Sequence, residues 1–302
     1  MNTIIVDGNS IGHANHSGAR LSVGDFEVQM IFGMLKSIRT MAQSYPSWKI
    51  IVVWDGEQNW RKEYYADYKA NRIAKTEQEQ KDKDSYKKQV PFARKALQLM
   101  GVPQMYATTH EADDVAGMLI IPTVEAGNNV VLATGDGDWK QYVSPQVMWF
   151  DPIRDRTVNH STFFECTGYR TPRQFVQGKA LMGDISDNIP GVGKIGEKSA
   201  PEVLAEFGSV EEFWRQVDSG EHIPRLAKMK NLALPETREI FQRNMKLMSL
   251  LDAPRPNKED IVVIKPTLDP GNFRRLCETL SFRSITRDMD GFLEPFERNK
   301  AA

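Results

Sequence analysis

Several acidic residues stand directly after short apolar runs, where carboxylates could gather to bind metal ions. The runs Thr3–Val6, Ile50–Trp54 and Val130–Ala133 are rich in β-branched residues, which favours buried strands. Ligands of open α/β sheets bind beyond the carboxyl ends of the strands, so three parallel strands would bring the following acids to one edge. These acids are Asp7, Asp55, Asp136 and Asp138.

Two further acidic groups lie later in the chain. The first is Glu111, Asp113 and Asp114, which open an expected helix. Acids at a helix start can serve only as caps or as partners of the helix dipole, but three acids in four residues exceed that need. The second is Asp184 and Asp187, which would share a face in a helical turn and could otherwise form a solvated turn. Their combination with the strand-end acids predicts a metal site.

The chemistry of such a cluster follows from its charge. Carboxylates held close together raise one another's pKa and repel, so this rim needs cations among its members. Oxygen ligands without metal-type His or Cys spacing favour Mg²⁺ or Mn²⁺ over zinc. This number of ligands suits two ions about 4 Å apart, the arrangement used in phosphodiester displacement. One ion would generate hydroxide from water, and both would stabilise charge on the phosphate.

A glycine-rich segment, residues 189–200, follows the last acidic group. Its glycines allow tight turns and expose backbone N–H groups, and a helix expected over residues 197–207 would point its amino end the same way. Two lysines add positive charge, which is typical of phosphate binding. The spacing is not that of a Walker loop, and a plain turn is the alternative. The candidate residues are Gly191, Gly193, Lys194, Gly196 and Lys198.

A basic and aromatic segment begins five residues after Asp55. Cations and rings recur there at three- and four-residue steps, which would place them on one face of a helix. Such a face suits single-stranded nucleic acid, because cations pair with phosphates and aromatic planes stack on bases. The alternative is a solvated helix whose tyrosines pack inward. The residues are Arg61, Tyr65, Tyr68, Lys69 and Arg72.

Strands alternate with helix-like stretches through the first half, which favours an α/β fold with a mainly parallel central sheet flanked by helices. Further strands are expected at Val102–Tyr106 and Val147–Phe150, and helices at Phe26–Ala42 and Arg94–Met100. Helix signals dominate from Thr171 onward, with one strand at Ile261–Ile264. We therefore expect an α/β domain over residues 1–170 and a mainly helical portion over residues 171–302.

The composition is that of a globular protein, with 302 residues, 40% of them hydrophobic, and a net charge of -1. This excludes a uniformly basic coat protein but not a local basic site, because residues 61–95 hold eleven basic and six acidic residues. Cys166 and Cys277 fit a reducing compartment. No signal peptide or membrane-spanning run is evident, so we expect a cytoplasmic protein.

Together these motifs resemble the 5′-nuclease (flap endonuclease) family, which includes phage replication exonucleases and the N-terminal nuclease domain of bacterial DNA polymerase I. The resemblance covers most of residues 1–210 in order, and the length is most similar to a stand-alone phage enzyme, in the host cytoplasm. The matching segments are Val6–Asn9, Asp55, Tyr68–Arg72, Glu111–Asp114, Thr134–Asp138 and Gly183–Gly196.

The resemblance implies a PIN-like fold and a structure-specific nuclease that removes 5′ flaps and RNA primers in DNA replication. It implies 5′→3′ degradation of duplexes and RNase H activity on RNA–DNA hybrid. It also implies two Mg²⁺ ions, for which Mn²⁺ can substitute. The acids that match the first ion's ligands are Asp7, Asp55, Glu111 and Asp113, with Asp114 close by. Those that match the second ion's ligands are Asp136, Asp138, Asp184 and Asp187.

Other implications concern DNA. Lys69 and Arg72 would be catalytic and contact the scissile phosphate from the base of a helical arch, expected over residues 60–95. The glycine-rich segment matches a helix–three-turn–helix, over residues 180–207, that grips the downstream duplex and binds K⁺. Lys179 matches a further DNA-binding position. The expected partners are branched or 5′-ended duplex DNA, with no membrane, no sliding-clamp segment and a monomeric state.

Two residues depart from the family pattern, Trp139 from a smaller apolar residue and Ser199 from a basic residue or threonine, and neither is expected to touch a metal ligand. Three rival functions remain. A PIN-like ribonuclease would lack the glycine-rich segment and the arch. A non-catalytic DNA-junction binder would not need so many acids. A phosphatase with an Asp nucleophile would need a second acid after Asp7, where Gly8 and Asn9 stand.

Overall fold

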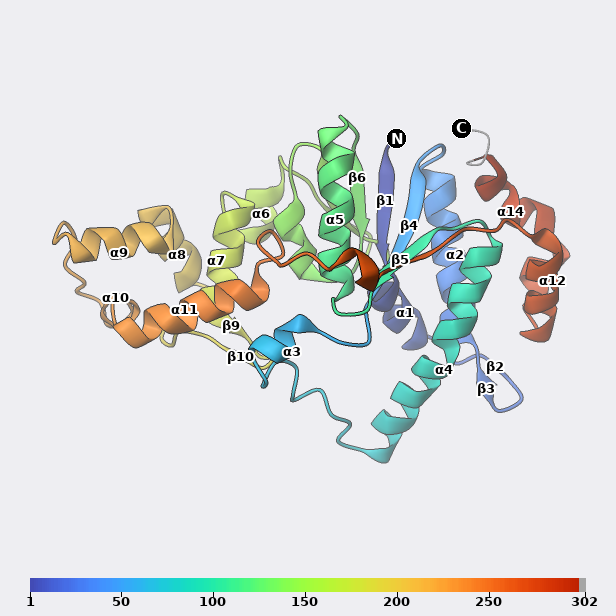
Figure 1. The fold of residues 1–302 in the computed structure, drawn as a ribbon, viewed down its shortest axis with the longest axis horizontal. Coiled ribbons are helices and arrows are strands. Elements are labelled where there is room, and N and C mark those ends of the chain that lie inside the picture. Colours follow the sequence, from blue (N-terminus) through green and yellow to red (C-terminus); the bar gives the residue numbers. More distant parts are fainter. Residues whose placement is uncertain (299–302) are drawn as a thin grey trace.

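A mixed, mostly parallel sheet of seven strands forms the centre of the computed structural model, which describes residues 1–298 (Figure 1). The strands are β1 (Thr3–Asp7), β4 (Lys49–Trp54), β5 (Gln104–Ala107), β6 (Val130–Ala133), β7 (Val147–Asp151), β8 (Arg156–Val158) and β11 (Ile261–Ile264). Their order is β11-β5-β4-β1-β6-β7-β8, with five parallel inner strands and antiparallel strands at both edges. The predicted α/β fold, with its five strands in the first half, is confirmed.

Helices cover both faces of the sheet because the inner strands are apolar on both sides. Along β1, Ile4 and Val6 pack with α1 and α2, whereas Ile5 packs with α5 and the 3₁₀ helix η1. The helix predicted from Phe26 begins later, since Phe26 pairs in a short hairpin with Val23. The elements concerned are α1 (Gly8–His16), β2 (Ser22–Val23), β3 (Phe26–Glu27), α2 (Gln29–Ser44), α5 (Ala112–Glu125) and η1 (Gly137–Tyr142).

The charged segment after β4 is not the single helix that its residue spacing predicted. Helix α3 (Trp60–Tyr64) is short, residues 65–76 form turns and bends, and α4 (Glu77–Leu99) then runs back to the sheet. Thr76 caps the amino end of α4, because its side chain accepts a hydrogen bond from the N–H of Glu79. In Figure 1 this segment lies below the carboxyl ends of β1 and β4.

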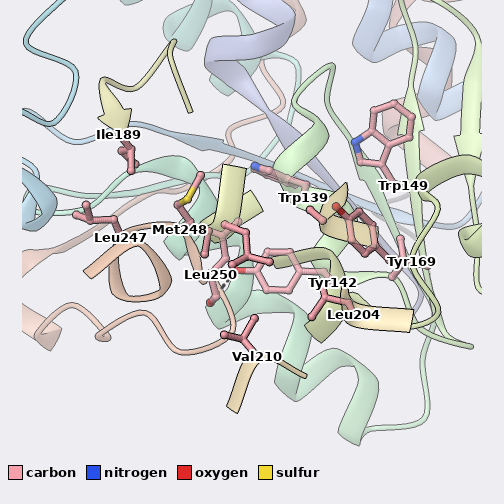
Figure 2. Close-up of a cluster of buried hydrophobic side chains, with 14 of the residues drawn as sticks. Trp139, Tyr142, Trp149, Tyr169, Ile189, Leu204, Val210, Leu247, Met248 and Leu250 are labelled. Atoms are coloured by element: carbon pink, nitrogen blue, oxygen red, sulfur yellow. Dashed lines mark hydrogen bonds between the residues drawn. The ribbon is translucent and has the colours of Figure 1, made fainter. Parts of the chain in front are cut away.

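A helical portion extends to one side of the sheet (Figure 1). It contains α6 (Phe163–Thr167), α7 (Pro172–Met182), β9 (Gly183–Asp184), β10 (Ile189–Pro190), α8 (Ser199–Phe207), α9 (Val210–Asp218), α10 (Ala227–Leu232) and α11 (Pro235–Met248). The chain around the end of α11 joins this portion to the sheet. Leu247, Met248 and Leu250 belong to the same buried cluster as Trp139 and Tyr142 of η1 (Figure 2).

The end of the chain returns to the sheet within the mainly helical portion expected over residues 171–302. The strand predicted at residues 261–264 is β11, which pairs with β5, and the helices after it pack against α2 and α4. These elements are η2 (Lys258–Asp260), α12 (Pro270–Thr279), α13 (Arg283–Arg287) and α14 (Met289–Arg298). Among residues 1–298, no helix is both long enough and apolar enough to span a bilayer.

Candidate active site

A cavity of about 370 Å³ opens at the carboxyl ends of β1, β4 and β6, and carboxylates dominate its wall. It is lined by eight of the nine acids predicted as metal ligands: Asp7, Asp55, Glu111, Asp113, Asp136, Asp138, Asp184 and Asp187. Adjacent parallel strands end at the same edge, and the start of α5 and the turn after β9 supply the remaining acids. Tertiary structure therefore concentrates negative charge from five separate stretches of the chain.

Asp7 is fixed in the centre of this wall. Its Oδ1 accepts a hydrogen bond from the Ser10 N–H at 2.9 Å, and its Oδ2 accepts one from the Thr134 hydroxyl at 2.8 Å. Burial, followed by the charges of Asp55 and Asp136, raises the pKa of Asp7 to about 7 despite these bonds. The roles of Ser10 and Thr134 as partners of Asp7 could not be predicted from the sequence, because a single hydroxyl near a strand end has no distinguishing spacing.

The neighbouring carboxylates are perturbed in the same direction. Loss of surrounding water, followed by the charge of Asp138, raises the pKa of Asp136 to about 6. Loss of water and the charge of Glu111 raise the pKa of Asp55, and burial and Asp136 raise the pKa of Asp113 well above its ordinary value. Bound cations would relieve this repulsion, and the oxygen donors, with no Cys or metal-spaced His, fit Mg²⁺ or Mn²⁺.

These shifts predict that Mg²⁺ stabilises the fold more at high pH than at low pH. The pKa of Asp7 is ordinarily 3.8 and rises to about 7 in the folded protein. Between pH 3.8 and about 7 the folded state therefore binds more protons than the unfolded state, so the folded state loses stability as the pH rises. Burial lowers the pKa of His13, so His13 makes the folded state more stable as the pH rises, opposite to Asp7. The quantity to compare is therefore the increase in melting temperature that Mg²⁺ causes at each pH. We expect a larger increase in melting temperature at about pH 8 than at about pH 5. Scanning fluorimetry measures it, and equal increments would contradict the prediction.

Trp139 touches a cavity carboxylate, which corrects the expectation that it does not. Its indole Nε1 donates a hydrogen bond to Asp113 Oδ1 at 2.7 Å, and its ring is fully buried in the same cluster as Tyr142 and Met248 (Figure 2). The Tyr142 hydroxyl donates to the Asp113 carbonyl at 3.1 Å. The large ring at this position therefore orients a carboxylate that a smaller apolar residue could not reach.

We expect Trp139→Phe to weaken Mn²⁺ binding about tenfold, since hydrogen-bonding partners of metal ligands commonly contribute about 10–100-fold in affinity. The change removes the indole donor and keeps an aromatic ring in the core. Isothermal titration calorimetry measures the affinity. Trp149→Phe is the matched control, because Trp149 Nε1 donates to the Asp136 carbonyl and not to a carboxylate. An unchanged affinity in a folded Trp139→Phe protein would refute the orienting role.

Asp114 lies outside the cavity, which corrects its grouping with the metal ligands. Its two oxygens accept hydrogen bonds from the two Nη atoms of Arg61, each at 2.7 Å. Arg61 was predicted to bind DNA, but its side chain is 1% exposed and its Nε donates to the Leu247 carbonyl at 2.8 Å. The Arg61–Asp114 pair is therefore an internal link between α3, α5 and α11, and Arg61 is not available to a nucleic acid.

The two predicted stacking tyrosines are not exposed platforms either. The Tyr68 hydroxyl is directed inward and donates to Glu111 Oε2 at 2.8 Å. Tyr65 is half-buried, with the Arg243 guanidinium 4.7 Å from its ring centroid. Because α3 ends at residue 64, the helical face predicted for this segment does not form. Arg61 and Tyr68 line the cavity together with Lys69 and Arg72, and only Tyr65 of the predicted face lies outside it.

Lys69 and Arg72 pair with the cavity's carboxylates. Lys69 Nζ bonds Glu111 Oε1 and lies 3.9 Å from Asp187 Oδ2, and Arg72 Nη2 bonds Asp187 Oδ1. Burial by itself would lower the pKa of Lys69, but the charge of Glu111 prevails and the pKa is raised. Lys69 also has a φ of 55°, a left-handed conformation that residues with side chains adopt mainly where the surroundings impose it.

Hydrogen bonds between distant segments impose this conformation. The turns after α3 dock against the tight turn between β9 and β10, which replaces the helical turn predicted for Asp184 and Asp187. Within that tight turn, Asp184 Oδ1 accepts the N–H groups of Ser186 and Asp187 at 2.8 and 3.2 Å. Three bonds of 2.8 Å join the segments: Lys69 N–H to the Asp187 carbonyl, the Asn71 amide to the Ile185 carbonyl, and the Asn188 amide to the Asp67 carbonyl.

Lys179, predicted as a DNA contact, also lies among the carboxylates. Its Nζ bonds Asp138 Oδ1 and is 3.4 Å from Asp184 Oδ2. Lysine and arginine side chains thus neutralise part of the cluster in this structure. Among residues 1–298, no three Asp, Glu, His or Cys side chains are already arranged as ligands of a metal ion.

The glycine-rich segment lies next to the cavity and leaves its basic side chains exposed. A Cβ on Gly191 would stand 2.2 Å from the Met182 carbonyl oxygen, so only glycine allows this close approach. Helix α8 begins at Ser199, whose Oγ accepts the Gly196 N–H at 3.0 Å. The candidate residues on the surface are Gly193, Lys194, Gly196 and Lys198. Their contact with phosphates stays a prediction.

Two family models match the chain. Residues 2–168 match the N-terminal resolvase-like domain of 5′-3′ exonucleases, and residues 170–265 match the C-terminal SAM fold of 5′-3′ exonucleases. The chain is 29% identical over 278 residues to DNA polymerase I of Streptococcus pneumoniae, covering 89% of this chain and 30% of that protein. It is 27% identical to a 5′-3′ exonuclease of Aquifex aeolicus, covering 88% of this chain and 86% of that protein.

Solved structures share the fold. The T5 5′-exonuclease with bound zinc is 25% identical, with a TM-score of 0.70 and coverage of 97% of this chain and 100% of that chain. The bacteriophage T5 flap endonuclease in a complex with DNA and metal ions also has a TM-score of 0.70, at 23% identity, with coverage of 97% and 100%. The resemblance stated from the sequence motifs is confirmed.

Proposed function

The chain belongs to the 5′-3′ exonuclease family, and from this premise we propose that it is a structure-specific nuclease acting at the 5′ ends of branched and duplex DNA. The observation that carries the proposal is the cavity in which eight carboxylates meet Lys69 and Arg72 at the carboxyl edge of the sheet. The substrates proposed are 5′ flaps and RNA primers, including RNA–DNA hybrid, during replication. Because the chain spans 30% of the polymerase's length, the polymerase's other activities are not part of this proposal.

The cofactors proposed are two Mg²⁺ ions, for which Mn²⁺ can substitute. When bound, they would activate water and neutralise charge on the phosphate. The T5 relatives with bound metal ions support a divalent cofactor. The side chains proposed to hold the first ion are Asp7, Asp55, Glu111 and Asp113. Those proposed to hold the second are Asp136, Asp138, Asp184 and Asp187.

Lys69 and Arg72 are proposed as the catalytic cations. Both line the cavity, and both hold their charge toward its carboxylates. Once cations occupy those carboxylates, the lysine and the arginine can turn to the scissile phosphate and stabilise the charge that develops on it. Their attachment to the β9–β10 turn supports this role, because the Lys69 N–H donates to the Asp187 carbonyl and the Arg72 Nε donates to the Ser186 carbonyl, which holds both residues beside the acids of the second group.

The DNA path is proposed to follow two features beside the cavity. The segment from α3 to α4 forms the arch over the 5′ strand, supported by the exposed lysines of α4. The segment from α7 to α8 forms the helix–three-turn–helix, with exposed Lys194 and Lys198 toward the downstream backbone and K⁺ at its turns. The helical residues 171–260 would then bind the duplex, and the α/β domain would cut it. The protein is proposed to act as a monomer.

A 5′-labelled flap substrate, incubated with and without Mg²⁺, tests the function. We expect Mg²⁺-dependent cuts near the junction between flap and duplex, followed by shorter products from the 5′ end. A ladder on a denaturing gel separates these patterns. Cleavage without metal, or no cleavage in either condition, would contradict the proposal. Cleavage of single-stranded RNA but not of the flap would instead support the PIN-like ribonuclease.

A further inference from the structure

Lys179 lies between the two pairs of acids proposed for the second cation. It is in the last turn of α7, where its Nζ bonds Asp138 Oδ1 and lies 3.4 Å from Asp184 Oδ2. One acid follows β6 at the sheet edge and the other belongs to β9, so the ammonium bridges two separate parts of the wall. Across residues 1–298, no other lysine or arginine forms an ion pair with either carboxylate.

The neighbouring lysine does not share this position. Lys140 is two residues from Asp138, but its Nζ stands over the Trp149 ring, 4.5 Å from the centroid. The side chain of Lys179 is 17% exposed. Its Nζ is within ion-pair distance of both the Asp138 and the Asp184 carboxylates. A full positive charge therefore occupies the oxygens that a divalent cation would need.

We propose that Lys179 is an internal counter-cation that must leave Asp138 and Asp184 before the second divalent cation binds, and that the freed ammonium then pairs with a phosphate of the substrate. This inference rests on the proposed function of the cavity as a divalent-cation site. The reason is competition, because an ammonium and a metal ion use the same carboxylate oxygens and repel each other at short range.

The competition has two consequences. Lys179 lowers the affinity of the second group of acids for a divalent cation. A phosphate in the cavity offsets part of that loss, because it gives the displaced ammonium a new partner. Cation and phosphate therefore bind cooperatively, and each raises the affinity for the other by the same factor. The second cation stays weakly bound until a phosphate arrives.

Calorimetric titration of the full chain with Mn²⁺ tests this inference in Lys179→Gln and Lys179→Met. We expect the weaker of the two Mn²⁺ dissociation constants to fall about tenfold in both variants, which corresponds to about 1.4 kcal/mol, with little change in the stronger one. Lys140→Gln removes the same charge from a nearby lysine that forms no ion pair with a carboxylate within residues 1–298. We expect it to change either constant by no more than about twofold.

A second titration uses thymidine 5′-phosphate, a phosphate that contains no bond for the nuclease to cut. After correction for Mn²⁺ bound by the nucleotide, it should lower the weaker dissociation constant of the wild type, and Lys179→Gln should lose this coupling. An unchanged or raised weaker constant in both folded Lys179 variants would overturn the inference. A wild-type protein that binds no Mn²⁺ would instead overturn the proposed function.

Discussion

Asp136→Asn is expected to lower the rate of flap cleavage about a thousandfold while changing the affinity for flap DNA by no more than about twofold. Asp136 follows β6, and the loss of water around it and the charge of Asp138 raise its pKa to about 6. An amide at this position offers one neutral oxygen in place of a charged carboxylate. Under the proposed function, the positive charge that acts on the phosphate would then be held less firmly, whereas DNA affinity would arise mainly from contacts with the DNA backbone.

The substitution is conservative for folding, so lost activity reports on the site. Asp136 Oδ1 accepts the Asp138 N–H at 2.8 Å at the start of η1, and an amide oxygen can accept the same bond. The change also removes one charge from a repulsive cluster. Without divalent cations, the melting temperature of the variant should therefore be at least that of the wild type.

Single-turnover cleavage of a labelled flap in Mg²⁺ and fluorescence anisotropy of the same DNA separate the two quantities. Asp25→Asn is the control. It removes the same charge, but Asp25 is exposed in the β2–β3 hairpin and does not line the cavity with the other acids. Equal losses of cleavage and of binding would show that Asp136 acts on substrate affinity. Cleavage close to the wild-type rate would remove Asp136 from the proposed metal ligands.

Arg61→Met is expected to lower the free energy of unfolding by about 3–5 kcal/mol. Methionine retains much of the apolar stem, but it leaves the carboxylate of Asp114, whose side chain is 1% exposed, without its cation. It also leaves the Leu247 carbonyl without the hydrogen bond from Arg61 Nε. An unpaired buried charge is costly because neither water nor another cation replaces the lost partner.

Urea denaturation followed by circular dichroism measures the loss. Arg215→Ala is the control: this arginine pairs with Glu212 and Glu221 at the surface with half of its side chain exposed, and exposed pairs contribute at most about 1 kcal/mol. Adding Asp114→Asn to Arg61→Met removes the unpaired charge and should recover part of the stability. If the double variant is less stable than Arg61→Met, the buried charge is not the cause.

The acids at the sheet edge could be predicted because their placement depends on local properties of the chain. Asp7, Asp55 and Asp136 each come after a run of β-branched residues, and such runs form inner strands. Parallel neighbours in a sheet necessarily end at one edge, whatever covers the two faces. The fold class and the concentration of charge at that edge therefore followed from sequence pattern alone.

The separation of Asp113 from Asp114 could not be predicted in this way. Each step along a helix turns the side chain by about 100°, so neighbours on α5 face different surroundings. Asp113 lines the cavity beside Trp139, whereas Asp114 pairs with Arg61, 53 residues earlier in the chain. Which acid faces which partner depends on how α5 packs against α3 and the sheet, and that packing has no local signature.

The basic residues show the same division between local pattern and tertiary contact. Residue spacing placed Tyr68 and Lys69 on an exposed helix, but bonds to the distant β9–β10 turn unwind this segment and direct both side chains inward. Lys179 likewise meets Asp138 only because α7 packs beside η1. The order of the residues specifies which charges exist and which elements carry them. Which charges meet depends on the packing of the elements, because burial and pairing arise from contacts between segments far apart in the chain.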